Sequence, residues 1–540
     1  MRKQYGIRRS LHGAASTGRT AATAVALAAV LAAIAGCGDQ YRPVVSAIGL
    51  VGPAAQQNKY AIAIASPTPT SNGLMTMVDF SGDTVMVTAP LGLNPYYLAL
   101  SPRGSYIYTL NSDDTVNSWG VTPNFIPGSV LQTTLLPGAN PASIFPTTSS
   151  TYIADPEFNA VDQLYGTPPA LKQELPVGTG YLPVYIVGQQ LAPRIYAISQ
   201  SASGGPGEVS AIENPFSAIA SPTISATLPV GRGPIYGVMT VDDRRVFITN
   251  QTDGTVSVIN SQTNALDQFP DPQHTFKISG FSIANNIVTF AVANTFQPGM
   301  TVAAAGLSIG TYLNGQTLTV LPTGLGPTQF EAAFTNPNVA FTPDTGTVAE
   351  LTGTIPVGTA PVWADLVSGL NELVVANAGN GTSPGSLSIV EIPLCSASVL
   401  PINPNCDPNN PIDAASFGQV VTTVPVGVNP VMVSVLSDYS RAYVANGGNP
   451  SLPCGTGAPG TGTTLCSISV VNLTTDTVTA TIPINGHPVW IATTNAAPTG
   501  KVYVVCKDSQ VMTVIETDTD SVDTTIPLQG YGISVRVTSP

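Results

Sequence analysis

One phrase, rich in proline and glycine, recurs along the chain and constrains its fold more than any other feature. Its pattern is (I/L/V)-P-x-G-x-x-P or a close variant, and its basal spacing is about 44 residues. The copies are APLGLNP (89–95), LPGANP (136–141), LPVGTGYLP (175–183), LPVGRGP (228–234), IPVGTAP (355–361), VPVGVNP (424–430), IPINGHP (482–488) and a degraded IPLQGYG (526–532). A fixed period of this length is typical of repeat architectures built from one small supersecondary unit.

Each repeat contains four segments with the character of short strands. The phrase is followed by an apolar segment, a tetrapeptide, an alternating segment such as TVSVIN (255–260), and a segment such as TVTATIPI (478–484) that leads into the next phrase. The tetrapeptides are YAIA (60–63), YTLN (108–111), YIAD (152–155), YAIS (196–199), FITN (247–250), VVAN (374–377), YVAN (443–446) and YVVC (503–506). Turns of Gly, Asn, Asp and Pro separate the segments, and 43% of the residues are hydrophobic, which predicts packed strands.

Radial stacking of such units solves a burial problem, because four antiparallel strands cannot bury both of their faces alone. The sequence therefore predicts an all-β fold, a β-propeller of four-stranded blades. Eight blades are expected, with seven as the alternative, since PASIFPTTSSTYIAD (141–155) is irregular. The first unit begins at its second strand, KYAIAIA (59–65), and the chain ends in YGISVRVTSP (531–540), so the C-terminal strand is expected to complete the first blade.

The recurring tetrapeptides, in fixed order with the other elements, resemble the YVTN-repeat family over roughly residues 59–537. This resemblance implies a propeller as well. The spacing between Pro234 and Pro361 is too long for the repeat, and the excess predicts a small β-domain inserted between the third and fourth strands of the fifth blade. The expected organisation is a signal peptide (1–37), a linker (38–58), the first part of the propeller (59–273), the inserted domain (274–350) and the second part of the propeller (351–540).

The N-terminus has the character of an export signal. A basic start, MRKQYGIRRS, precedes the apolar run 21–36, which ends in the tetrapeptide IAGC at Cys37. This resembles a bacterial lipoprotein signal, which implies lipidation of Cys37. The alternative is a transmembrane anchor, but the run is shorter than the roughly 20 residues that span a bilayer. We therefore expect an exported protein, lipid-anchored to the bacterial cell envelope in the periplasm or at the cell surface.

The charge balance limits the partners. Removal of residues 1–37 leaves 13 Lys and Arg against 31 Asp and Glu, a net charge of −18. Such an acidic surface argues against nucleic acid and against docking on anionic lipid by charge. The expected partner is a protein, a peptide or a glycan, with the membrane reached through the lipid.

Two pairs of cysteines lie close together in the sequence. Cys395 and Cys406 fall between the third and fourth strands of the sixth blade, and Cys454 and Cys466 between the second and third strands of the seventh. Since export permits disulfides and the spacing fits no zinc pattern, two local disulfides are expected. Cys506 is expected to be a buried free thiol.

The sequence offers little material for catalysis, and we expect no catalytic residues, no cofactor and no metal site. Only His274 and His487 remain after the signal is removed, one at the boundary of the insert and one in a blade junction, which leaves almost no material for a catalytic triad or a multi-histidine metal site. An aromatic side chain, however, recurs two residues after the junction proline and is expected near the mouth of the central channel. These candidate ligand-stacking residues, which alternatively pack between blades, are Tyr97, Tyr185, Tyr236, Trp363 and Trp490, with Ser143 and Met432 at equivalent positions.

These observations favour a non-enzymatic binding or scaffold module. One alternative is a propeller enzyme, of lactonase, lyase or quinoprotein type, with a carboxylate-based site. Another is a structural component of a surface layer. Because propellers serve unrelated functions, the fold does not choose among these.

Overall fold

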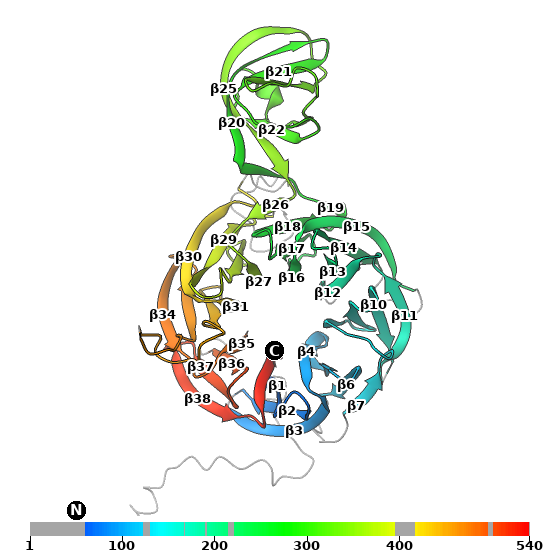
Figure 1. Ribbon diagram of the computed structural model, residues 1–540, viewed down its shortest axis with the longest axis vertical. Helices are drawn as coiled ribbons and strands as arrows, with labels where there is room; N and C mark the ends of the chain where they lie inside the picture. Colours follow the sequence, from blue (N-terminus) through cyan, green and yellow to red (C-terminus); the bar gives the residue numbers. More distant parts are fainter. Residues whose placement is uncertain are drawn as a thin grey trace, which may run out of the picture. The chain divides into compact units, whose positions relative to one another are not determined.

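The computed structural model describes residues 60–538, apart from 81, 122–129, 167, 190–191, 214–220, 395–415, 459 and 495–499. Eight sheets of antiparallel strands surround a centre, like the blades of a propeller (Figure 1). Their innermost strands contact one another in the cyclic order β39, β4, β8, β12, β16, β27, β31, β35 and back to β39. This closed ring confirms the all-β propeller and its eight blades.

The blades follow the repeat units of the sequence. Blade 1 consists of β39 (Tyr531–Val537), β1 (Tyr60–Ser66), β2 (Asn72–Asp79) and β3 (Thr84–Leu93). Blade 2 consists of β4 (Pro95–Leu100), β5 (Tyr106–Asn111), β6 (Thr115–Gly120) and β7 (Leu131–Thr134), with the 3₁₀ turn η2 (Pro102–Gly104) after β4. Blade 3 consists of β8 (Ser143–Pro146), β9 (Thr151–Asp155), β10 (Ala160–Tyr165) and β11 (Ala170–Pro176). Blade 4 consists of β12 (Tyr181–Val187), β13 (Arg194–Ser201), β14 (Pro206–Glu213) and β15 (Thr223–Arg232).

The second half of the ring repeats the pattern. Blade 5 consists of β16 (Pro234–Met239), β17 (Arg245–Asn250), β18 (Thr255–Asn260) and an outer strand in two pieces, β19 (Ala265–Leu266) and β26 (Thr354–Pro356). Blade 6 consists of β27 (Pro361–Val367), β28 (Glu372–Asn377), β29 (Pro384–Glu391) and β30 (Val420–Val428). Blade 7 consists of β31 (Pro430–Val435), β32 (Arg441–Asn446), β33 (Ser467–Asn472) and β34 (Thr477–Pro483). Blade 8 consists of β35 (Pro488–Thr493), β36 (Lys501–Cys506), β37 (Val511–Glu516) and β38 (Ser521–Pro527).

The glycine of the recurring phrase has a packing role. In four copies it lies at the end of the outer strand of one blade, against the asparagine that closes the second strand of the next blade. These copies are Gly92, Gly231, Gly358 and Gly427. A Cβ built on Gly358 would approach the Asn377 side chain to 2.5 Å, and one on Gly427 would approach the Asn446 side chain to 2.6 Å. Only glycine permits this contact, which explains the glycine of these four copies.

The buried asparagine in turn organises its own blade. The Asn377 carboxamide donates hydrogen bonds to the hydroxyls of Ser386 (3.1 Å) and Ser388 (3.0 Å) on the third strand. Asn446 bonds Ser467 (3.2 Å) and Ser469 (2.9 Å) in the same way. In the blades whose tetrapeptide ends in asparagine, the phrase and the tetrapeptide thus form one polar junction between neighbouring blades.

The ring is closed by pairing between the two ends of the described chain. β39 pairs antiparallel with β1, from Ala61 opposite Val537 to Ser66 opposite Tyr531. Beyond the ladder, the Tyr60 N–H donates to the Thr538 hydroxyl (2.9 Å) and the Thr538 N–H donates to the Tyr60 carbonyl (3.0 Å). Closure of the first blade by the C-terminal strand is therefore confirmed.

A six-stranded sheet interrupts blade 5. Its strand order is β23-β22-β25-β20-β21-β24, and its core includes Phe281, Phe290 and Phe330. The strands are β20 (Phe269–Ala284), β21 (Ile287–Val292), β22 (Thr301–Ala305), β23 (Thr317–Thr319), β24 (Gln329–Ala333) and β25 (Val339–Thr352), with the 3₁₀ turn η3 (Thr311–Leu313). β19 and β26 both pair with β18, so this sheet is inserted within the fourth strand of blade 5, whereas the sequence pointed to the connection before that strand.

Candidate functional site

The five predicted stacking residues lie on the innermost strands of five blades. Each side chain retains partial solvent exposure. Their rings contact one another across blades: Tyr97–Trp490 at 6.2 Å between centroids, Trp490–Trp363 at 5.3 Å, Trp363–Tyr236 at 3.7 Å and Tyr236–Tyr185 at 4.8 Å. We call these five residues the aromatic belt.

Arg536 of β39 joins the aromatic belt. Its guanidinium lies 4.2 Å from the centroid of the Trp490 ring, in position for a cation–π interaction, and its Nε donates to the Leu98 carbonyl (3.3 Å). Burial raises the pKa of Tyr97, and burial likewise raises that of Tyr185. These phenols are therefore neutral hydrogen-bonding groups rather than bases.

A carboxyl group lies two residues after Trp363 on the same strand. Burial raises the pKa of Asp365 to about 6. Its two oxygens accept backbone N–H groups, Oδ1 that of Leu366 (2.9 Å) and Oδ2 that of Val435 (2.8 Å), so it links the innermost strands of blades 6 and 7. The rings of the aromatic belt contact one another and Arg536, and stacking of a ligand on them stays a prediction.

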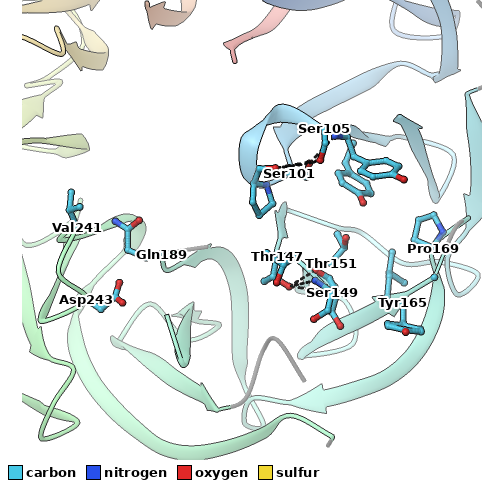
Figure 2. A pocket seen from close by; sticks show the side chains of 17 residues that line it. Ser101, Ser105, Thr147, Ser149, Thr151, Tyr165, Pro169, Gln189, Val241 and Asp243 are labelled. Atoms are coloured by element: carbon cyan, nitrogen blue, oxygen red, sulfur yellow. Dashed lines mark hydrogen bonds between the residues drawn. The ribbon is translucent and has the colours of Figure 1, made fainter. Parts of the chain in front are cut away.

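A pocket of about 920 Å³ lies elsewhere, on loops of blades 2 to 5 (Figure 2). We call it the hydroxyl pocket because Ser, Thr and Tyr make up most of its lining. Its walls come from first-to-second strand connections of four blades and from the β10–β11 connection. The lining residues are Ser101, Pro102, Ser105, Tyr106, Tyr108, Thr147, Thr148, Ser149, Ser150, Thr151, Leu164, Tyr165, Gly166, Pro169, Gln189, Val241 and Asp243.

Local hydrogen bonds hold the hydroxyl wall in place. The Thr147 hydroxyl donates to the Ser150 carbonyl (2.8 Å) and accepts the Ser150 N–H (3.1 Å), which closes the turn between β8 and β9. The Ser101 hydroxyl accepts the Tyr106 N–H (2.8 Å) and so fixes the start of β5. Ser and Thr side chains favour such hydrogen bonds to nearby backbone groups in turns. The turns held in this way present further hydroxyl groups to the pocket.

Two tyrosines supply exposed aromatic surface at this pocket. The exposed fraction is 36% for Tyr106 and 44% for Tyr165. The Lys172 ammonium lies 5.4 Å from the centroid of the Tyr165 ring. Flat apolar faces beside hydroxyl groups suit a ligand that is itself both apolar and rich in hydroxyls.

Asp243 is the one acidic residue in the lining. Burial and the neighbouring Asp242 raise its pKa, and one of its carboxylate oxygens is buried without a hydrogen-bond partner among the described residues. The raised pKa extends the pH range in which this carboxyl group is protonated and can donate a hydrogen bond.

Blade 3 departs from the asparagine rule described above. Its second strand ends in Asp155, and Asp162 occupies the position of the bonded serine on the third strand. Both side chains are fully buried, and neither oxygen of Asp162 has a partner in the described part of the chain. Burial, with a contribution from Asp155, raises the pKa of Asp162 to about 7. Because this acid pair is closed off from solvent, it is a structural anomaly rather than a substrate site.

The cysteines fall into three groups. Cys454 and Cys466 form a disulfide with Cα atoms 5.5 Å apart. Cys506 is free and buried, and burial raises the pKa of its thiol to about 12, so it stays protonated. Cys395, Cys406 and the proposed lipidation site Cys37 lie outside the described residues.

His487 fastens the disulfide loop to blade 8. Its Nδ1 lies 2.7 Å from the Asp508 carboxylate and its Nε2 lies 3.1 Å from the Leu452 carbonyl. The hydrogen bond from His487 lowers the pKa of Asp508 despite partial burial. Both ring nitrogens of His487 thus take part in hydrogen bonds that hold the Cys454–Cys466 loop against blade 8.

Sequence patterns missed the hydroxyl pocket because its residues come from connections that share no motif. A usable signal existed in the irregular segment 141–155, whose PTTSS stretch forms one wall. A segment that departs from the pattern of a repeat is a place where a functional or strained site is expected.

Within the described part of the chain, none of the helices combines the length and apolarity that a bilayer crossing requires. No family model matches the sequence, and no curated protein matches it either.

Solved structures do resemble the fold. The dihydro-heme d1 dehydrogenase NirN, in complex with DHE, is 10% identical with a TM-score of 0.54, over 91% of this chain and 78% of NirN. Apo AztD from Citrobacter koseri is 10% identical with a TM-score of 0.46, over 89% of this chain and 97% of AztD. A putative 6-phosphogluconolactonase from Bacteroides fragilis is 10% identical with a TM-score of 0.42, over 90% of this chain and 99% of that one. At such low identity, it is the β-propeller fold alone that the likeness to NirN shows for this chain.

Proposed function

We propose that the protein is a binding module for a neutral oligosaccharide, which it takes into the hydroxyl pocket. The observation that carries the proposal is the lining, which combines many hydroxyl groups with the exposed rings of Tyr106 and Tyr165. Sugars offer hydroxyls for hydrogen bonds and C–H faces for aromatic rings, so this lining matches both of their surfaces.

The charge of the lining favours a neutral ligand over an anionic one. Asp243 is the single Asp, Glu, Lys or Arg residue in the lining of the pocket, and the chain as a whole is acidic. An enzyme that uses Asp243 as its acid is the alternative at the same pocket. Release of reducing sugar from a bound oligosaccharide would favour the enzyme, and unchanged ligand recovered after binding favours the binding module.

Tyr165→Ala is expected to weaken binding of the preferred oligosaccharide about tenfold, because one aromatic contact contributes roughly 1–1.5 kcal/mol. Tyr106→Ala is expected to act similarly. The ligand is chosen from a glycan array that includes malto-, cello-, xylo- and chito-hexaoses, and affinities are then measured by calorimetry.

The matched control is Phe158→Ala, because Phe158 is 40% exposed but lies between β9 and β10, at the opposite ends of the blade 3 strands from the pocket loops. This control should bind like the wild type. If Tyr165→Ala, Tyr106→Ala and Phe158→Ala all bind the oligosaccharide with equal affinity, or if the array shows no bound neutral glycan, the hydroxyl pocket is excluded as the oligosaccharide-binding site.

We also propose that the chain is a distant member of the YVTN-repeat family. Its tetrapeptides lie in the second strand of their blades, for example YTLN in β5, YVAN in β32 and YVVC in β36, which supports a shared structural role for the motif.

The remaining part of the proposal is lipid anchoring at Cys37 on the cell envelope, which rests on the N-terminal sequence. Cys37→Ser is expected to abolish labelling by a fatty-acid analogue and to shift the protein from the detergent phase to the aqueous phase. Retention of the variant in the membrane fraction would point instead to an apolar anchor in residues 21–36.

A further inference from the structure

Three side chains meet where the inserted sheet begins and ends. Asp271 and His274 belong to β20, and Glu350 belongs to β25. The His274 Nδ1 lies 2.9 Å from Oδ2 of Asp271 and 3.0 Å from Oε2 of Glu350. The three atoms all lie within 4.8 Å of one another.

An irregularity in the β20–β25 ladder creates this meeting point. Pro270 pairs with Leu351, but the next pair is Thr275 with Ala349, so residues 271–274 face Glu350 alone. The bulge is held by the Thr275 hydroxyl, which donates to the Asp271 carbonyl (2.6 Å), and by the Gln273 N–H, which donates to Oδ1 of Asp271 (2.8 Å). Bulges of this kind re-aim side chains, and here the bulge turns Asp271 and His274 to the same point.

One ring nitrogen cannot form good hydrogen bonds with two carboxylates at the same time. The Nδ1 atom carries at most one proton, which can point directly at only one of the two oxygens. A cation placed among the three atoms satisfies all of them at once. Ligands 2.0–2.2 Å from a tetrahedral Zn²⁺ are about 3.4 Å apart, close to the spacing found here.

We propose that Asp271, His274 and Glu350 form a binding site for a divalent transition-metal ion, with Zn²⁺ as the best match. The imidazole nitrogen favours Zn²⁺ over Ca²⁺ and Mg²⁺, which prefer oxygen ligands. Two carboxylates balance the charge of the ion. His274 is 45% exposed, so solvent can reach the ion and fill the fourth position.

The site links the first and last strands of the inserted sheet. The sequence predicts no metal site, because histidine is scarce. This site needs a single histidine, His274, and two carboxylates that lie 79 positions apart, Asp271 and Glu350. The bound ion acts as a cross-link between β20 and β25.

The test titrates tag-free, metal-stripped protein with Zn²⁺ by calorimetry and with Co²⁺ by visible absorption. We expect one ion per chain and a Co²⁺ spectrum of nitrogen and oxygen ligation without a thiolate charge-transfer band. His274→Gln should weaken Zn²⁺ binding at least a hundredfold, and Glu350→Gln at least tenfold. Asp518→Asn, an exposed carboxylate in the turn after β37, should bind like the wild type.

Circular dichroism and the melting temperature without metal show whether each variant is folded. Because Glu350→Gln keeps size and hydrogen bonding, it serves as the second variant if His274→Gln unfolds. Wild-type protein that binds no Zn²⁺ in the micromolar range would overturn the proposal. So would folded His274→Gln protein that binds Zn²⁺ as the wild type does, which would mean adventitious binding elsewhere.

Discussion

A chain that ends at Gly530 is expected to lose roughly 5 kcal/mol or more of its stability, at least a third of the 5–15 kcal/mol of a typical domain. The truncation removes β39, the innermost strand of blade 1, which pairs with β1 and packs against the innermost strands of blades 2 and 8. It also exposes apolar surface that Val535 covers at present. Thermal or denaturant unfolding followed by circular dichroism measures the loss.

The matched control ends at Thr538 and loses only residues 539–540. It keeps the paired hydrogen bonds between Thr538 and Tyr60, so it should melt like the full chain. A synthetic peptide of residues 531–538, added to the Gly530 truncation, should restore part of the lost stability. If the Gly530 truncation melts like the control, β39 does not close the ring in solution.

Asp162→Asn is expected to raise the free energy of unfolding by about 2 kcal/mol at pH 8. The pKa of Asp162 is about 7 in the folded chain, against about 3.9 when unfolded. The protonated carboxyl therefore favours folding below pH 4, and this contribution is lost as the pH rises through 7. Each pKa unit corresponds to about 1.4 kcal/mol, which puts the penalty of ionising Asp162 at roughly 4 kcal/mol, and we expect the asparagine to relieve about half of it.

The variant's asparagine can donate to Asp155, as Asn250 donates to Ser257 (2.9 Å) in blade 5. Its stability should thus change less between pH 5 and pH 8 than that of the wild type, as urea unfolding at several pH values would show. Asp518→Asn serves again as the exposed control. Identical pH profiles for wild type and Asp162→Asn would mean that Asp162 is ionised in the folded chain without penalty.

The sequence repeats predicted the scaffold because each blade carries its own copy of the same local signals. Pro-Gly phrases mark junctions, tetrapeptides mark second strands, and the count of both gave eight blades closed by residues 531–537. The insert was recognised from its spacing, but its entry point inside the fourth strand was not. β19 is only two residues long, too short for any period to show.

The sites were harder to predict, because they depend on which loops of different blades come together. Thr147 and Tyr165 belong to one blade, but Gln189 and Val241 reach the hydroxyl pocket from two others, and no sequence spacing relates them. The aromatic positions were identified on the correct strands, yet the contacts between them depend on the radius of the propeller, which the sequence does not show. The Asp in YIAD, where four other blades have Asn, was a visible signal of the acid pair.

The pairing of β1 with β39 also bears on the order of folding. The bonded residues Tyr60 and Thr538 are 478 positions apart, and closing a flexible loop of that length costs about 5 kcal/mol of chain entropy. The strands of the other blades meet through much shorter connections, so those blades can assemble earlier. Until blade 1 forms, the chain is an open row of blades with an uncovered sheet face at each end. The time needed to close it is therefore the period in which this protein is most exposed to aggregation.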